Sequence, residues 1–141
     1  MHFDLSRFHD AQKGIFETAL EEIKNGRKRS HWMWFIFPQL SGLGRSDTAR
    51  YYSIKNFNEA EAFLRDPVLG KRLIEISTAL LKLNGKTPNE IFGFPDDAKL
   101  HSSMTLFSLV ENSDPVFQEV LNKYFQGRPD ENTMRLLGSG Q

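Results

Sequence analysis

Hydrophobic residues recur along most of this chain at intervals of three and four positions, which is the period of an α-helix with one buried face. The pattern is clearest near the N-terminus, where polar residues separate the apolar positions Phe8, Ile15, Phe16, Ala19, Leu20 and Ile23. Asn25 and Gly26 follow them, and such a pair is typical of a helix end. The spacing therefore predicts an amphipathic helix over residues 7–24.

Residues that begin helices recur further along the chain. Short polar side chains cap the free N–H groups of a first turn, and proline fits the first helical position. Such residues stand at Ser46, Asn58, Asp66, Thr87, Asp114 and Asp130, with Glu61 completing a capping pair for Asn58. The helices that they predict span residues 47–53, 59–65, 67–83, 88–93, 116–125 and 131–137.

Two apolar segments lack a clear period. Residues 96–112 carry apolar side chains all round a helical wheel, so a buried helix and a strand both fit them. We favour a helix capped by Asp96 or Asp97, because the chain offers few strands to pair with. Residues 32–37 are apolar on both alternating faces and must be largely buried before Pro38 ends the segment. Five phenylalanines at helical positions are expected in the core: Phe92, Phe94, Phe107, Phe117 and Phe125.

These elements predict an all-α fold, a single compact multihelical domain of about six or seven helices. The sequence contains no low-complexity linker and no internal repeat that would mark a domain boundary. We assign residues 1–137 to this helical domain and residues 138–141 to a frayed C-terminal tail. A chain of 141 residues can bury a core without disulfides or metals.

The amino-acid composition excludes several kinds of functional site. Without cysteine, the chain has no thiol nucleophile, thiolate zinc site or disulfide, which fits a reducing cytoplasm. The longest apolar run, residues 32–37, is far shorter than the roughly 20 residues that span a bilayer, so we expect no membrane association. The four histidines, at positions 2, 9, 31 and 101, form no pair at metal-ligand spacing. We therefore expect neither a metal site nor a cofactor.

Charge is balanced overall but uneven along the chain. The sequence has 18 basic and 18 acidic residues, which disfavours nucleic acid as a partner. Six of the basic residues, and Asp47 as the one acidic residue, fall between Lys24 and Arg50. Within this stretch Lys28, Arg29 and His31 adjoin Trp32 and Trp34, a combination that could hold a phosphate and stack a ring. In the alternative arrangement the tryptophans are in the core and the cations in solvent.

A glycine turn follows the basic stretch. Gly42 and Gly44 precede Ser46, the expected first cap of a helix, where free backbone N–H groups favour an anion. Glycines would let the backbone approach that anion closely. The spacing matches neither a Walker loop nor a dinucleotide-binding fingerprint, so a tight turn with an ordinary cap explains it as well.

The candidate ligand-binding residues come from these two stretches and from the segment after Asp96. Ser102 and Thr105 share a face of the predicted helix and could donate to a ligand that Lys99 attracts, or they could bond back to carbonyls one turn earlier. His31 is the best candidate for a general acid or base. The full set is Lys28, His31, Trp34, Gly42, Gly44, Arg45, Ser46, Lys99, Ser102 and Thr105.

Four blocks of sequence carry a resemblance to a known family. They are GRKRSHWMWFIFPQLSGLGRSDTARYYSI, DPVLGKRL, DDAKLHSSMTLF and a D-x-x-T near the C-terminus. In their order the chain resembles the bacterial domain of unknown function 1810 from Phe8 to Leu137, some members of which carry the label "calpastatin". The resemblance implies one multihelical domain and no particular activity. A calpain inhibitor of that type is a disordered chain that folds on its target. Because 12% of the residues here are aromatic and follow the pattern of a packed domain, the label "calpastatin" does not fit this chain.

The features together suggest a domain that binds a small anionic ligand, such as a nucleotide or another phosphorylated metabolite. One alternative is a protein-interaction module that presents the aromatic residues 32–37. Another is a hydrolase or transferase that acts on a nucleotide-type ligand with His31 as acid and base. Nucleic-acid binding through the basic stretch is a weaker hypothesis. The exposure of Trp32 and Trp34 discriminates between a ligand site and a contact patch.

Overall fold

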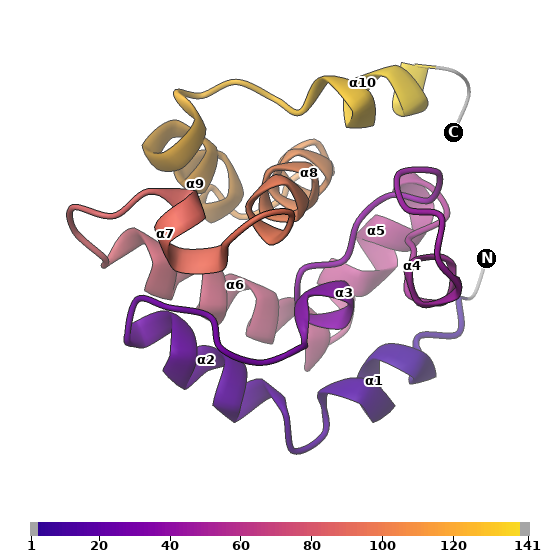
Figure 1. Ribbon diagram of the computed structural model, residues 1–141. Coiled ribbons are helices and arrows are strands. Elements are labelled where there is room, and N and C mark those ends of the chain that lie inside the picture. The colour runs from indigo at the N-terminus through magenta and orange to yellow at the C-terminus, as the bar shows by residue number, and fades with distance from the viewer. Residues whose placement is uncertain (1–2, 139–141) are drawn as a thin grey trace.

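The all-α fold is confirmed. The computed structural model describes residues 3–138, and within them it contains ten helices and no strand (Figure 1). The helices are α1 (Ser6–Gln12), α2 (Phe16–Lys24), α3 (Met33–Ile36), α4 (Asp47–Tyr51), α5 (Phe57–Arg65), α6 (Leu69–Leu81), α7 (Pro88–Phe92), α8 (Asp96–Ser108), α9 (Val116–Phe125) and α10 (Glu131–Gly138). One isolated parallel bridge joins Leu40 to Ile54.

The prediction of six or seven helices is wrong, since the structure forms ten in residues 3–138. The predicted first helix is divided into α1 and α2 at Gly14, whose φ of 76° interrupts a right-handed helix. Helix α3, of four residues, lies in residues 32–37, for which the sequence predicts burial but no helix, whereas the five-residue helices α4 and α7 fall within the predicted spans 47–53 and 88–93. A turn as short as α3 is held by packing rather than by helix propensity, so the hydrophobic period does not show it.

Most of the predicted caps are present. Thr87 and Glu90 form a reciprocal capping box at α7, Asp114 accepts from the N–H of Val116, and Asp130 accepts from the N–H of Thr133. The cap of α5 is Asn56 rather than Asn58, with its side chain accepting from the N–H of Glu59. Both asparagines have an acidic residue three positions later, so the sequence alone does not distinguish them.

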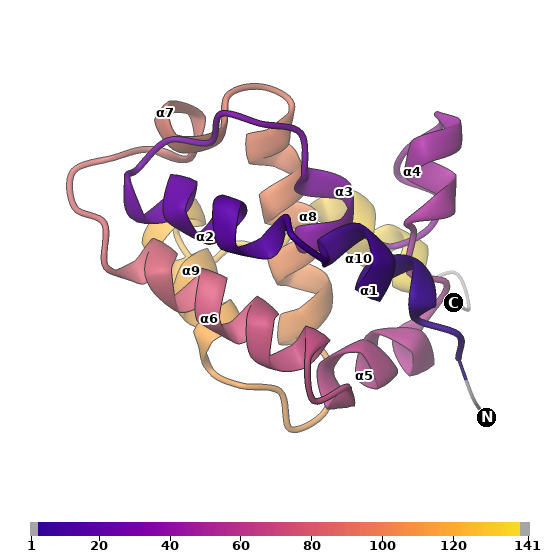
Figure 2. The ribbon, with the colours of Figure 1, turned by 90° about the horizontal axis from the view of Figure 1, so that it is seen from below.

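The two longest helices, α6 and α8, have 13 residues each, and both pack against several other helices. Helix α6 packs against α2, α5 and α9, while α8 packs against α5, α7, α9 and α10. Figure 2 shows α2 running alongside α6, with α8 behind them. Helix α8 is buried on several sides, which explains why its apolar residues showed no single face.

Residues 32–37 lie mostly inside the core, as their composition predicts. Trp32, Met33, Ile36 and Phe37 are buried, whereas Trp34 and Phe35 are half-buried. The prediction of a buried Phe94 is wrong, because 84% of its surface is exposed. Phe94 follows Gly93, which has a φ of 74° and ends α7, so the residue falls in the connection to α8 instead of on a helix face.

The C-terminal segment ends in helix α10, which includes Gly138 of the predicted tail. Residues 139–141 of that tail lie outside the described residues. No helix within residues 3–138 is both long enough and apolar enough to cross a membrane.

Candidate functional site

The basic loop between α2 and α3 is organised by one carboxylate, that of Glu22. It accepts hydrogen bonds from the N–H groups of Arg29 and Ser30, from the Ser30 hydroxyl and from Nε1 of Trp32, at 2.6 to 3.1 Å. Burial acts to raise the pKa of Glu22, but these hydrogen bonds outweigh it and lower that pKa to about 2. The N–H groups of this loop are therefore already bound to an anionic group of the protein itself, the Glu22 carboxylate.

Three of the predicted site residues meet at one place. The ammonium groups of Lys28 and Lys99 lie 2.9 and 3.1 Å from the two carboxylate oxygens of Asp96. The Lys99 ammonium also lies 3.8 Å from the centroid of the Trp34 ring. We call this group, Lys28, Trp34, Asp96 and Lys99, the Trp34 corner.

The charges of the Trp34 corner do not cancel. Two ammonium groups face one carboxylate, and the exposed fractions of the Lys28 and Lys99 side chains are only 8% and 18%. Burial acts to raise the pKa of Asp96, yet hydrogen bonds from both lysines and their charge lower it overall. The carboxyl is thus ionised at neutral pH, and one positive charge of the cluster remains unbalanced.

The glycine turn touches the corner through Gly44 but has a structural role there. A Cβ at Gly44 would lie 2.5 Å from Cβ of Ala49 and 3.5 Å from the Trp34 ring, so the glycine is required for close packing. Ser46 caps α4 as predicted, accepting from the N–H of Ala49. However, α4 has only five residues, too few for the helix terminus to attract an anion strongly.

The rest of the turn lies beside the corner without joining it. Gly42, with a φ of 102°, faces the side chain of Leu136 in α10. Arg45 is exposed, and no polar contact of its side chain is formed within residues 3–138.

Ser102 and Thr105 hold α10 in place instead of facing the corner. Thr105 accepts from the N–H of Asp130 at 2.9 Å, and the Ser102 hydroxyl lies 3.4 Å from the Asp130 carboxylate. Both hydroxyls also donate to carbonyls one turn earlier in α8, those of Ala98 and His101. The alternative in which these hydroxyls donate to carbonyls of their own helix is therefore the one observed.

His31 is exposed, and it makes no polar contact with the Trp34 corner in the described chain. The contact patch suggested for residues 32–37 is contradicted by their burial, since Trp32 is 1% exposed and donates to Glu22. Trp34, which remains half-buried beside Lys99, is the tryptophan that a surface ligand could reach.

Sequence reasoning missed two residues that organise the site, Glu22 and Asp96. The prediction that Asp96 or Asp97 caps α8 is wrong, because the cap position is Pro95 and no side chain caps the helix there. Asp96 instead pairs with Lys99, three residues later, which is the spacing of a helical ion pair. Nothing in the local sequence connects Asp96 with Lys28, or Glu22 with the loop that it binds, because tertiary folding brings them together.

Five surface pockets of about 320 to 460 Å³ are lined by other residues than those of the Trp34 corner. No group of three or more potential metal ligands occurs within residues 3–138. A ligand at the corner would therefore lie on the surface and compete with the Asp96 carboxylate.

Comparison with known proteins places the chain in a family. The crystal structure of the conserved hypothetical protein Rv1873 from Mycobacterium tuberculosis matches it with a TM-score of 0.94 and 46% sequence identity, over 96% of this chain and 97% of that one. No protein with a curated description matches the sequence. Residues 2–137 match the family described as "Protein of unknown function (DUF1810)". The resemblance seen in the sequence is thereby confirmed, and the chain belongs to the DUF1810 family.

Proposed function

We propose that this protein binds a small anionic ligand, a nucleotide or another phosphorylated metabolite, at the Trp34 corner. The observation that carries the proposal is the convergence of Lys28 and Lys99 on the single carboxylate of Asp96. A cluster with one unbalanced positive charge, largely removed from water, attracts anions more strongly than an exposed lysine does.

The hydrogen-bonding capacity of the corner supports this. An ammonium group has three donors. Lys28 uses donors on Asp96 and on the Ser30 carbonyl, while Asp96 is the one acceptor that Lys99 contacts in the described chain. Donors of Lys99 thus remain for a phosphate oxygen, directly above the Trp34 ring.

Stacking of a base of the ligand on Trp34 is less well supported than recognition of its anionic group. The Lys99 ammonium already covers one face of Trp34, and Gly44 packs beside the ring. We therefore assign recognition to the anionic group, and a base or sugar would extend past the corner. We propose a cytoplasmic localisation, because the sequence contains no cysteine and so fits a reducing compartment.

We propose binding rather than a reaction. The hydrolase or transferase alternative needs an acid and base close to the anion, and His31 is exposed and outside the corner. An interaction module built on residues 32–37 would need them exposed, and most are buried. No specific observation favours either alternative over anion binding.

Tryptophan fluorescence tests the proposal. The protein is titrated with inorganic phosphate, pyrophosphate, a sugar phosphate and ADP, and the emission change is assigned by repeating the titration with Trp34→Phe. We expect saturable changes that Trp34→Phe abolishes and that weaken as salt rises. Lys99→Met should weaken binding about five- to tenfold, whereas Lys71→Met, which removes an exposed lysine of α6, should leave it unchanged.

The opposite result is equally clear. If the whole panel leaves both emission and melting temperature unchanged at millimolar concentration, the Trp34 corner is a structural ion-pair cluster and no ligand site.

A further inference from the structure

A second group of basic side chains lies away from the Trp34 corner, between the start of α1 and the end of α4 with the segment that follows it. It borders a pocket of about 410 Å³, lined by Asp4, Ser6, Arg7, Arg50, Tyr51, Ser53 and Lys55. We call this pocket the Arg7 pocket. Its volume exceeds that of a phosphate group and lies within the range of small-molecule sites.

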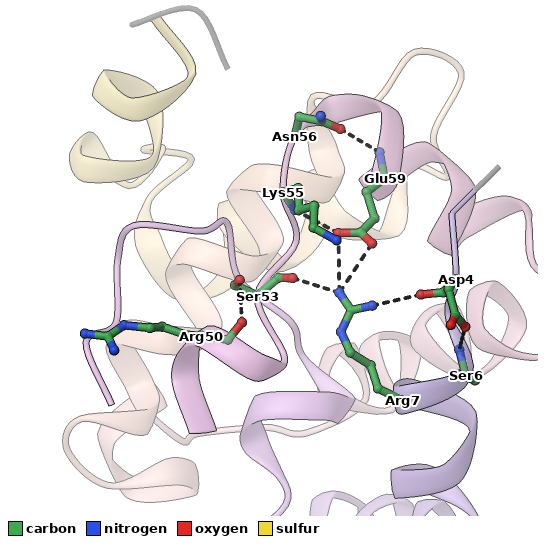
Figure 3. A network of polar contacts seen from close by, with 8 residues as sticks. All are labelled: Asp4, Ser6, Arg7, Arg50, Ser53, Lys55, Asn56 and Glu59. Atoms are coloured by element: carbon green, nitrogen blue, oxygen red, sulfur yellow. Dashed lines mark hydrogen bonds and ion pairs between the residues drawn. The ribbon is translucent and has the colours of Figure 1, made fainter. Parts of the chain in front are cut away.

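Arg7 is fixed at one side of this pocket. Its guanidinium donates to the carbonyls of Asp4 and Ser53, both at 2.9 Å, and to the carboxylate of Glu59 at 3.3 and 3.4 Å (Figure 3). Only 13% of the Arg7 side chain is exposed. A guanidinium held in this way loses little further conformational freedom when it meets an anion.

The counter-charge beside Arg7 is already committed. Glu59 is fully buried, and it also accepts the N–H of Lys55 at 2.8 Å. Asp4 accepts the N–H of Ser6 at the start of α1. Glu59 therefore balances the charge of Arg7, whereas Asp4 binds the N–H of Ser6 through its carboxylate and the arginine through its backbone carbonyl.

Two more cations border the pocket on exposed side chains. Arg50 is 69% exposed and has only a long contact of 3.7 Å with the fully exposed Asp47, which is worth little in water. Lys55 is exposed, and its ammonium makes no polar contact in the part of the chain that the structure describes. Figure 3 shows Arg50 extending away from Arg7, so its guanidinium would reach a ligand by rotating.

An aromatic side chain completes the lining. Tyr51 is 60% exposed and rests edge-on against Tyr52, with ring centroids 4.8 Å apart. A tyrosine fixed by a neighbour yet open to solvent offers a face to the organic part of a ligand at low entropic cost.

We infer that the Arg7 pocket is a second anion-binding site, which takes a phosphate group whose organic substituent contacts Tyr51. Arg7 supplies donors held in a fixed orientation, while Arg50 and Lys55 supply the charge and close on the ligand from outside. The site is independent of the Trp34 corner, with which it shares no residue.

Amide NMR of the full chain tests this inference, with pyrophosphate and AMP as separate probes. We expect saturable shifts at the amides of residues 6–7 and 50–55. The double variant Arg50→Gln/Lys55→Gln should bind both probes at least tenfold more weakly. The matched control Lys13→Gln/Lys71→Gln removes two exposed lysines elsewhere and should keep the affinity. Tyr51→Ala should weaken AMP but not pyrophosphate.

Three outcomes would overturn the inference. Shifts without saturation, or equal losses in the two double variants, would show general attraction to a charged surface. Equal affinity of wild type and Tyr51→Ala for AMP would show that Tyr51 does not contact the organic part of the ligand. Because Lys99→Met leaves the Arg7 pocket intact, its shifts should persist in that variant, which separates this site from the proposed function.

Discussion

The ammonium group of Lys99 lies 3.8 Å from the centroid of the Trp34 ring, within the range of a cation–π interaction. The same ammonium is 3.1 Å from Asp96, so one lysine joins the aromatic residue of α3 to the carboxylate at the start of α8. The contact connects the stability of the corner with its ability to attract an anion.

Replacing this lysine by methionine keeps the length of the side chain and removes its charge. We predict that Lys99→Met lowers the free energy of unfolding by about 0.5–1 kcal/mol, the value of a partly exposed cation–π pair. The emission of Trp34 should change in the folded state. Urea unfolding followed by fluorescence measures both, and Lys71→Met should alter neither. A loss as large for Lys71→Met would mean that the contact with Trp34 contributes nothing specific.

Acid should weaken the loop that Glu22 holds. Since folding lowers the pKa of Glu22 from an ordinary value near 4.5 to about 2, its contribution is complete above pH 4.5 and disappears as the pH falls toward 2. We predict that Glu22→Gln costs about 1–3 kcal/mol at pH 7, because hydrogen bonds to the carboxylate are lost.

The comparison between the two proteins isolates this residue from the other carboxylates. Denaturant unfolding of wild type and Glu22→Gln at pH 7, 4 and 2.5 should give curves whose difference shrinks with acidity. A difference that is constant over this range would show that Glu22 is not ionised in the way its four donors indicate.

Local sequence was sufficient to predict a helix start where the capping side chain and the N–H group that it binds are close in sequence. Asp114 and Asp130 cap the helices predicted from them, because the cap and the N–H group that it accepts are two or three residues apart. It was insufficient at Gly14, where the hydrophobic period continues across a break, and at Phe94, which has helical spacing but lies in a connection.

The candidate site follows the same division. Lys28, Trp34 and Lys99 could be chosen by residue type, since cations beside aromatic residues suit an anion. Their common partner Asp96 could not, because the contact with Lys28 is created by packing of distant segments. Ser102 and Thr105 have the chemistry of ligand donors, yet tertiary structure commits them to Asp130 and to α8 itself.

Gly44 is the position where the glycine turn can be tested. A Cβ there would lie 2.5 Å from Cβ of Ala49, so we predict that Gly44→Ala lowers the free energy of unfolding by about 1–3 kcal/mol. The variant Gly44→Ala/Ala49→Gly removes the clash and should recover part of the loss in a double-mutant cycle. Gly138→Ala in α10, where the added carbon meets nothing within 4 Å, is the control. Additive losses would mean that the two sites do not touch.

Ser103 carries a hydroxyl that is fully buried in α8 and has no hydrogen-bond partner within residues 3–138. Since an unpaired buried hydroxyl destabilises the fold, we predict that Ser103→Ala raises the free energy of unfolding by about 1 kcal/mol. The neighbouring Ser102→Ala, which removes a hydroxyl bonded to Ala98, should not stabilise the protein. Thermal and urea unfolding compare the two. A less stable Ser103→Ala would reveal a partner for that hydroxyl.

Asp96 provides the most direct test of the Trp34 corner, because its carboxylate occupies the place between the lysines that a ligand anion would share. Asp96→Asn keeps the shape of the side chain and removes its charge, leaving Lys28 and Lys99 without their counter-ion. Calorimetric titration with pyrophosphate should show binding to the wild-type protein and affinity about tenfold higher for Asp96→Asn, a gain of about 1.4 kcal/mol. Equal affinity for the two folded proteins, or no binding to either, would contradict an anion site at this corner.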